Sequence, residues 1–535
     1  ELLQEEGYPR PPVWISVTLS DASARTLSRQ TPEAFRISVS HANPILFGFN
    51  CSLGVDQMGK HVREISPVVQ GCHLALYPNA GLPNELGRYT DTPEHMAQKV
   101  AELAREGLIN VIGGCCGTTP DHINAISKAI SGIPPRQLPP KDHTVLKVSG
   151  LEAMHIKTGA SNFVNIGEMC NVAGSRTFLN RIKAGKFEEA AKLAKSQIEG
   201  GAHLIDVNMD DAMLDAPSAM REFLNVCGVD PSICKTPFVI DSSRLAAIEA
   251  GLGSVQGKCI VNSISLKEGE EPFLKAARIC RKYGAAIIVM AFDEEGQAVT
   301  KEHKVRVCER AYKLLTEKLN VPPEDIIFDL NILMIGSGME EHRNYAVNFI
   351  EATREIKQKM PLARISGGVS NLSFAFRPNE TVRQAMHSAF LLHAIEAGMD
   401  MGIVNASKLI PYTSLPETLR KLAEDVVLNK SADAGDKLSE LAKQISGQGT
   451  SIGVTSEQQQ KEKWLKMPVE ERLKQRIVDG STDGLIDDLT EATRAGPQTA
   501  VQILEGPLMA GMAQVGDLFG SGKMFLPQVL RSARV

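Results

Sequence analysis

The chain has 535 residues, of which 43% are apolar and 23% charged, so it is long enough for two or three domains with separate cores. Its 58 basic and 63 acidic side chains are well mixed and give a formal net charge of −5, which disfavours nucleic acid as a ligand. There is no signal peptide and no apolar run of about 18 residues that could cross a bilayer, so we expect a cytoplasmic protein with no membrane partner. Ten cysteines are too few for a disulfide scaffold and are expected to be reduced thiols or thiolate ligands.

Four apolar runs in the first 140 residues each lead into a turn rich in Gly, Asn, Pro or Ser. This pattern predicts buried parallel strands, and Thr92-Pro93-Glu94 predicts a capped helix start between the last two. Four such units make half of a (β/α)8 barrel, so we assign residues 1–140 to a partial barrel. The Pro-dense stretch 133–141 cannot continue a helix or a strand, and we assign residues 141–157 to a linker. The four runs are residues 13–19, 44–50, 73–78 and 108–114.

Eight strand candidates alternate with helical patterns between residues 158 and 430. This number and length predict a complete (β/α)8 barrel. The carboxyl ends of the strands in such a barrel face the active site, and most of the ends predicted here carry polar residues that a scaffold does not need. The predicted strands end near Glu168, Asn208, Ser242, Ser263, Phe292, Asn331, Gly368 and Asn405.

The remaining residues are expected to form a second linker over 431–460 and a helical bundle over 461–535. Gly480, the pair Gly496-Pro497 and the glycines at 520 and 522 predict the breaks between helices. The predicted fold class is therefore α/β, with a complete (β/α)8 barrel preceded by a partial (β/α)8 barrel and followed by an all-α bundle. Because the chain begins without Met and stops inside a helical pattern, we expect it to be part of a longer polypeptide.

Three cysteines stand where predicted strands end. Cys51 follows Asn50, and residues 113–120 read Gly-Gly-Cys-Cys-Gly-Thr-Thr-Pro, with glycines that allow the sharp turn that Cys115 and Cys116 need to face one ligand. Three thiolates would leave the fourth position of a tetrahedral zinc open, as in catalytic zinc sites. Ordinary buried cysteines are the alternative, and we prefer that interpretation for the other seven.

Residues 113–120, with Asn50 and Cys51, resemble the homocysteine-binding domain of the cobalamin-dependent methionine synthases. This resemblance implies that Cys51, Cys115 and Cys116 hold Zn²⁺ and that the sulfur of homocysteine takes the open position. It covers only the later half of that domain, whose early strands supply other contacts to homocysteine.

The polar strand ends of the second barrel suit a flat ligand with alternating donors and acceptors, such as a reduced pterin. A carboxylate can accept from a ring N–H and an exocyclic amine together, while amides satisfy the carbonyl and the remaining nitrogens. The alternative is that each Asp or Asn only caps the helix that follows its strand. Capping alone is a poor account of so many polar strand ends in one barrel.

These strand ends resemble the pterin-binding barrel of methionine synthases and related corrinoid methyltransferases, across about residues 158–430. The matching strings are residues 165–168, 171–175, 206–210, 240–243, 261–265 and 367–371. The resemblance implies that the pterin edge is bound by Asp241, Asn262 and Asp329. It also implies that the pocket is lined by Glu168, Asn171 and Asp206, and that Arg377 is a further candidate contact.

The resemblance places Asn371 near pterin N5, and we assign catalytic roles to Asn371 and Asp241. The methyl group leaves a tertiary amine, which is a poor leaving group unless its nitrogen gains a proton or a strong hydrogen bond. Asn371 has no useful pKa, but its amide could donate a hydrogen bond that strengthens as N5 becomes basic.

Residues 516–527 are similar to the helical cap that precedes the cobalamin-binding domain in the same family. The resemblance implies that Phe519 and Leu526 cover the upper face of the corrin, although such residues near a glycine break usually belong to a core. The D-x-H-x-x-G signature of lower-face cobalt ligation does not occur in the chain. The cobalamin-binding and reactivation domains are therefore expected to belong to the same, longer polypeptide.

The function that we predict is methyl transfer from 5-methyltetrahydrofolate, through cobalamin, to zinc-activated homocysteine, giving methionine and tetrahydrofolate. The substrates are then small molecules, and we expect a monomer. Two alternatives remain: a pterin enzyme of the dihydropteroate synthase type, and a folate-binding and capping module without turnover of its own.

Overall fold

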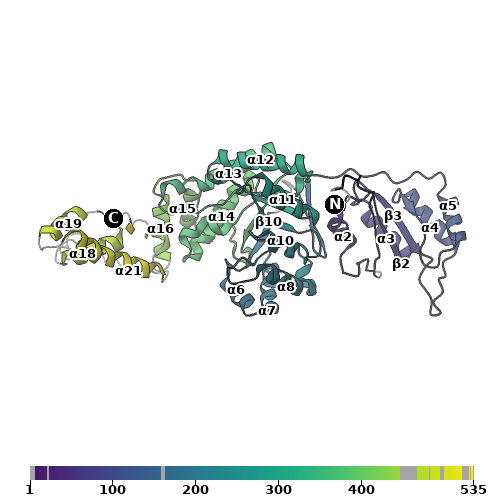
Figure 1. Cartoon of the computed structure of the whole chain (residues 1–535), viewed down its shortest axis with the longest axis horizontal. Coiled ribbons are helices and arrows are strands. Elements are labelled where there is room, and N and C mark those ends of the chain that lie inside the picture. The colour runs from purple at the N-terminus through teal and green to yellow at the C-terminus, as the bar shows by residue number, and fades with distance from the viewer. Residues whose placement is uncertain are drawn as a thin grey trace. The chain divides into compact units, whose positions relative to one another are not determined.

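The computed structural model describes residues 6–20, 23–157, 163–445 and 467–520, apart from 481, 483 and 495–498, and also positions 529, 532, 533 and 535 (Figure 1). Contacts divide the chain into two compact units. The first comprises residues 1–295, 308–328 and 360–364, and the second comprises 296–307, 329–359 and 365–535. Among the helices that the structure describes, none is both long enough and apolar enough to cross a bilayer.

The first segment contains a parallel sheet of four strands in the order β1-β2-β3-β4. The four predicted apolar runs therefore all form strands. Helices pack on this sheet because one face of each is apolar; Met58 and Val62 of α3 and Val100 of α4 are fully buried in the core. The elements are β1 (Trp14–Val17), α2 (Pro32–Ser38), β2 (Leu46–Gly54), α3 (Val55–Ile65), β3 (His73–Asn79), α4 (Pro93–Arg105), β4 (Val111–Ile112) and α5 (Pro120–Ile130).

The residues that we assigned to the first linker contain an antiparallel hairpin of β5 (Val145–Ser149) and β6 (Ala153–Lys157). The hairpin contacts the first segment, since the Thr31 amide donates to Leu151 O at 3.0 Å. It also contacts the barrel that follows, since the Ser149 amide donates to Lys258 O at 3.0 Å. Four of the five residues of β5 are buried, so the hairpin packs between the first segment and the barrel.

The second barrel contains an eight-stranded sheet in the order β15-β14-β11-β10-β9-β8-β7-β16. A parallel bridge between Gly368 and Ile403, just beyond β15 and within β16, links the two ends of this order. All eight predicted strands form, each ending within three residues of its expected position. They are β7 (Val164–Asn171), β8 (Leu204–Asn208), β9 (Phe238–Asp241), β10 (Ile260–Ile264), β11 (Ala286–Met290), β14 (Ile326–Asp329), β15 (Arg364–Ser366) and β16 (Met401–Val404).

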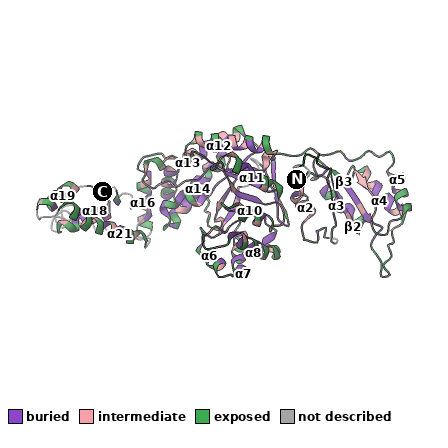
Figure 2. Ribbon diagram, viewed as in Figure 1, coloured by how far each residue is buried: buried purple, intermediate pink, exposed green. Residues whose placement is uncertain are grey.

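The helices between these strands are amphipathic, and Figure 2 shows buried residues concentrated on the strands. In α11, Phe273 and Leu274 are buried, two glutamates occupy the first turn and two basic residues occupy the last, as the helix dipole favours. The helices are α6 (Arg176–Lys183), α7 (Phe187–Glu199), α8 (Ala216–Val229), α9 (Pro231–Cys234), α10 (Leu245–Leu252), α11 (Glu270–Lys282), α12 (Lys301–Lys313), α13 (Tyr345–Lys359), α14 (Glu380–Ala397) and α15 (Glu417–Val427).

The C-terminal region is helical where it is described. Gly480 ends α18 with a φ of 63°, as predicted, and Arg472 and Arg476 of α18 form buried ion pairs with Asp488 of α19. The predicted breaks at 496–497 and 521–522, and residues 446–460 of the second linker, lie outside the described residues. The helices are α16 (Ala434–Ile445), α18 (Val469–Asp479), α19 (Leu485–Arg494), α20 (Ala500–Ile503) and α21 (Met509–Gly520).

Candidate functional site

The three predicted cysteines converge at the carboxyl ends of β2 and β4. Cys51 Sγ lies 3.5 Å from Cys116 Sγ, and Cys115 Sγ lies 3.9 Å from Cys116 Sγ. All three sulfur atoms lie within 4.8 Å of one another. Tetrahedral zinc with Zn–S bonds of about 2.3 Å requires sulfur atoms about 3.8 Å apart, which is close to both of these distances.

The backbone reaches this arrangement through conformations that most residues avoid. Cys51 and Ser52 have φ values of 60° and 67°, where β2 loses its regular register with β3. Gly117 has a φ of 80°, and a Cβ there would lie 2.4 Å from the side chain of Tyr89. Left-handed conformations of non-glycine residues cost free energy and gather at functional sites, which favours a role for Cys51 beyond packing.

Hydrogen bonds hold the turn that carries Cys115 and Cys116. The Cys115 amide donates to Pro78 O at 2.9 Å, and the Cys116 amide donates to Asn79 Oδ1 at 3.1 Å. The Thr118 hydroxyl donates to Cys115 O at 2.7 Å. Asn79 therefore orients the thiol pair, a role that the sequence reasoning missed although its position at the end of β3 was available as a signal.

The thiols differ in their acidity. Hydrogen bonds from the Ser52 backbone and from neighbouring thiols hold the pKa of Cys51 below its usual value, whereas burial and the hydrogen bond with Cys51 raise the pKa of Cys115 to about 11. Once one thiol of the cluster ionises, its negative charge disfavours ionisation of the other two. A bound cation would remove this conflict, because it favours the thiolate form of each ligand.

A second group of predicted residues lies together at the carboxyl ends of β7 to β10, within the first unit. Asn171 Nδ2 donates to Asp241 Oδ2 at 3.4 Å, and Asn262 Nδ2 donates to Asp206 Oδ1 at 3.3 Å. Asp206 and Asn262 are buried, while Asn171 and Asp241 are half-buried. Asn171 also accepts from the Ala173 amide at 2.9 Å, so part of its role is the local turn that the capping alternative describes.

Asp206 and Asp241 form an unusual pair. Burial, followed by the charge of Asp241, raises the pKa of Asp206 well above its ordinary value. Two neighbouring carboxyl groups do not both ionise readily, so Asp206 tends to keep a proton. Glu168, also half-buried in β7, is part of the same strand as Asn171.

A residue that we did not predict organises this strand edge. Asp210 accepts from the hydroxyl of Ser242 at 2.7 Å and from the amide and hydroxyl of Ser243 at 2.7 and 2.8 Å. Arg244 Nε lies 3.4 Å from Asp210 Oδ1. Asp210 belonged to a string that carried the resemblance, but only the structure reveals that it ties the loop after β9 to the loop after β8.

The second unit carries Asp329 at the end of β14. Asp329 is 7% exposed, its Oδ1 accepts from the Asn331 amide at 2.8 Å, and burial raises its pKa from 3.8 to about 6. Lys304 is completely buried nearby and donates to Leu330 O at 2.5 Å and Asn331 O at 3.3 Å. Neither Asn331 nor Lys304 was among the predicted site residues; the lysine stands in a helical pattern that gives no sign of its burial.

The other predicted residues of the second unit are accessible. Asn371 is exposed in the helical turn that follows β15, where its amide donates to Gly368 O at 3.2 Å. The Arg377 guanidinium lies 4.9 Å from the ring centre of Phe374, which is 51% exposed. Phe519 is 43% exposed on α21, and Leu526 lies outside the described residues.

Three protein families match successive parts of the chain. Residues 1–130 match homocysteine S-methyltransferase, residues 167–405 match pterin-binding enzymes, and residues 469–535 match a B12-binding domain. The chain is thus a multidomain protein with methyltransferase, pterin-binding and B12-binding parts. These parts follow one another in the order found in cobalamin-dependent methionine synthase, which confirms the predicted resemblance.

Solved structures of dihydropteroate synthases resemble part of the chain in fold. One from Yersinia pestis, with a pterin-sulfa conjugate, is 13% identical, with a TM-score of 0.35, over 52% of this chain and 98% of its own. One from Burkholderia cenocepacia is 15% identical, with a TM-score of 0.36, over 57% and 97%. One from Vibrio fischeri is 13% identical, with a TM-score of 0.35, over 57% and 99%.

Proposed function

We propose that the chain takes part in methyl transfer from 5-methyltetrahydrofolate, through cobalamin, to homocysteine, giving methionine and tetrahydrofolate. The observation that carries this proposal is the convergence of Cys51, Cys115 and Cys116 within the part that matches homocysteine S-methyltransferase. The pterin-binding match supports a folate as the methyl donor, and the B12-binding match supports cobalamin as the methyl carrier. A dihydropteroate synthase would need neither the cysteine cluster nor the B12-binding part.

Zinc fits the cysteine cluster, since three soft sulfur ligands at tetrahedral spacing leave one position for a substrate thiol. When bound, zinc would keep a coordinated thiol deprotonated at neutral pH, where a free thiol is mostly protonated. Asn79 and the turn around Gly117 fix the direction of Cys116, so that the three sulfur atoms converge and could hold one ion. The ion would then make the sulfur of homocysteine a better nucleophile.

For the donor, we propose that Asp241 accepts from the pterin ring N–H and exocyclic amine while Asn262 and Asn171 satisfy neighbouring ring atoms. Asp206, which tends to stay protonated, supports Asp241 as the acceptor. Glu168 is proposed to line the same pocket. The pterin contacts proposed for Asp329, Asn371 and Arg377 of the second unit rest on the family resemblance, with Asn371 donating a hydrogen bond to N5 as the methyl group leaves.

The exposed Phe519 and the residue Leu526 are proposed to cover the corrin face that carries the methyl group. Apolar cover would exclude water from a reactive carrier between the two transfers. The main cobalamin-binding and reactivation domains would be separate parts of the complete polypeptide.

Zinc analysis of the purified chain tests the first site. We expect about one zinc per chain, loss of that zinc in Cys115→Ser, and retention in Cys234→Ser, which changes a buried cysteine outside the cluster. Competition with a chromophoric chelator gives the affinity of each variant. Absence of zinc from the unmutated chain under zinc-replete conditions, or equal zinc in both variants, would refute the proposed ligand set.

A methyl-transfer assay with 5-methyltetrahydrofolate and added cob(I)alamin tests the second site. Asn371→Ala should slow transfer more than it weakens folate binding, because the hydrogen bond strengthens only as N5 becomes basic. Asp241→Asn should weaken folate binding directly. Equal losses of rate and affinity in Asn371→Ala would make Asn371 a binding residue, and folate binding without zinc or transfer would favour a binding module.

A further inference from the structure

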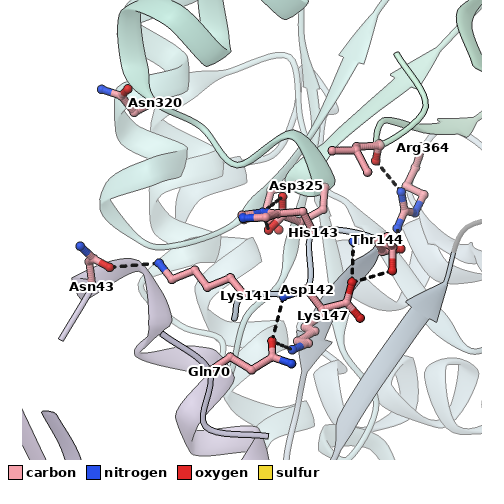
Figure 3. A network of polar contacts seen from close by, with 12 residues as sticks. Asn43, Gln70, Lys141, Asp142, His143, Thr144, Lys147, Asn320, Asp325 and Arg364 are labelled. Carbon is pink, nitrogen blue, oxygen red and sulfur yellow. Dashed lines mark hydrogen bonds and ion pairs between the residues drawn. The ribbon is translucent and has the colours of Figure 1, made fainter. Parts of the chain in front are cut away.

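A cavity of about 340 Å³ lies in the first unit, away from both proposed sites. Its walls come from the loops that follow α2 and α3, from residues 141–147, and from the loops that precede β10, β11 and β14. These last loops stand at the amino ends of the barrel strands, whereas Asp206 and Asp241 stand at or near the carboxyl ends. Figure 3 shows part of the wall from close by.

Five basic side chains line this cavity without forming an ion pair to any carboxylate among the described residues. Their hydrogen bonds are to uncharged groups: Lys147 Nζ donates to Gln70 Oε1 at 3.0 Å, and Lys141 Nζ donates to Asn43 Oδ1 at 3.2 Å (Figure 3). The arginines donate to backbone carbonyls. The five are Arg10, Arg36, Lys141, Lys147 and Arg281.

The acidic side chains of the same wall already have partners. Asp325 holds Lys258 Nζ at 2.6 and 2.7 Å, and Glu324 lies 2.9 Å from His143 Nδ1. Glu33 lies 2.8 Å from His155 Nε2. Asp142 accepts from the Thr144 amide and hydroxyl at 2.9 and 2.6 Å. With the histidines neutral, the six basic and four acidic side chains of the wall leave a net charge of about +2 in the cavity.

The crowding of these charges affects neighbouring groups. Burial, followed by the charges of Lys258, Arg10 and Arg281, lowers the pKa of His41. Burial is also the largest cause that lowers the pKa of Lys147 and of Arg281. The Nε atom of Arg36 is buried and has no hydrogen-bond partner, which is costly for a guanidinium group. An anion in the cavity would favour the charged forms of His41, Lys147 and Arg281.

We propose that this cavity binds a small phosphorylated organic molecule. Lysines supply point charges and arginine forks can hold phosphoryl oxygen atoms in pairs, which suits a group with several negatively charged oxygens. The volume lies at the lower end of the range for organic ligands and exceeds the space that a single ion needs. Apolar wall residues such as Ile37, Val145 and Ile287 give the organic part a surface to contact.

Such a ligand would join two parts of the first unit. Arg36 belongs to α2 and Lys147 to β5, whereas Arg281 lies in the last turn of α11 of the barrel. Anion binding would therefore strengthen the attachment of the first segment to the barrel, without contact to the cysteine cluster or the pterin residues. The expected signature is thermal stabilisation together with binding that saturates.

Calorimetric titration of the whole chain with ADP, inorganic pyrophosphate and citrate, at constant ionic strength, tests the proposal. We expect saturable binding of ADP that is tighter than that of pyrophosphate, and little binding of citrate. Tighter pyrophosphate binding would assign the cavity to an inorganic phosphate and overturn the organic part of the proposal. Preference for citrate would overturn the phosphoryl class.

Variants locate the binding. The double change Lys141→Gln and Lys147→Gln should weaken ADP binding at least tenfold. The single change Arg281→Gln should also weaken ADP binding, by a smaller factor. Lys313→Gln removes one charge from an exposed position of α12 outside the cavity and should leave the affinity unchanged. Folate titration and circular dichroism confirm that each variant is folded. Equal weakening by Lys313→Gln, or no saturable binding by the unmutated chain at millimolar ADP, would refute the proposal.

Discussion

The substitution Asp329→Asn tests how much free energy it costs to ionise this buried carboxyl group in the pterin barrel. Asp329 is buried at the end of β14, and its pKa of about 6 means that ionisation costs more free energy in the folded chain than in the unfolded chain. An asparagine keeps an oxygen that can accept from the Asn331 amide but carries no charge. The folded state binds the proton of Asp329 more tightly than the unfolded state does, so this group lowers the stability of the chain as pH rises from about 4 to about 6.

The size of the effect follows from the change in pKa. A rise from 3.8 to about 6 corresponds to about 3 kcal/mol of unfolding free energy, all of which is lost above the folded pKa. Asp329→Asn should therefore gain stability at pH 7.5 relative to the unmutated chain. About 2 kcal/mol of the difference should disappear between pH 7.5 and pH 4. Any cost of burying the new amide is independent of pH and does not affect this change.

Urea unfolding followed by circular dichroism, at pH 4 and pH 7.5, measures the difference for both proteins. Folate titration in parallel should show weaker binding by Asp329→Asn if this carboxylate contacts the pterin, so that stability and affinity change in opposite directions. Asp121→Asn, which removes a carboxyl group from an exposed position at the start of α5, serves as the control. A stability difference for Asp329→Asn that does not change with pH would refute the reasoning.

Three further substitutions test other parts of the structure. Gly117→Ala should lower both the zinc content and the unfolding free energy. Gly107 has a φ of 70° but open space around it, so Gly107→Ala should keep its zinc and lose only about 1 kcal/mol of unfolding free energy. Equal zinc in both variants would contradict the packing argument. Lys304→Met should lower the unfolding free energy by about 3 kcal/mol, measured with urea, because three carbonyl groups lose their buried donor. Asp325→Asn should cost about 3–5 kcal/mol in the same assay, since it leaves Lys258 buried with an unpaired charge, and an unchanged midpoint would show that water reaches this pair.

The sequence predicted the strands of both barrels because buried parallel strands are short apolar runs between turn signals, and this pattern is local. It also predicted the cysteine cluster, since Cys51 and the pair after Gly114 each follow a strand, and parallel strands present their carboxyl ends at one edge. The residues at the ends of β7 to β10 were predicted for the same reason. The hairpin of β5 and β6 was missed because prolines before it suggested a linker, and its stability comes from contacts on both sides.

The sequence by itself determined which residues stand at the strand ends, and therefore which chemistry is available to the chain. Only the tertiary structure decided how those residues share protons and charge. The raised pKa of Asp206 depends in part on Asp241 from the next strand. The cavity of the first unit is lined by Arg36, Lys147 and Arg281, which come from three separate elements. Burial and electrostatic interaction depend on distances between residues far apart in the chain, and no local pattern encodes those distances.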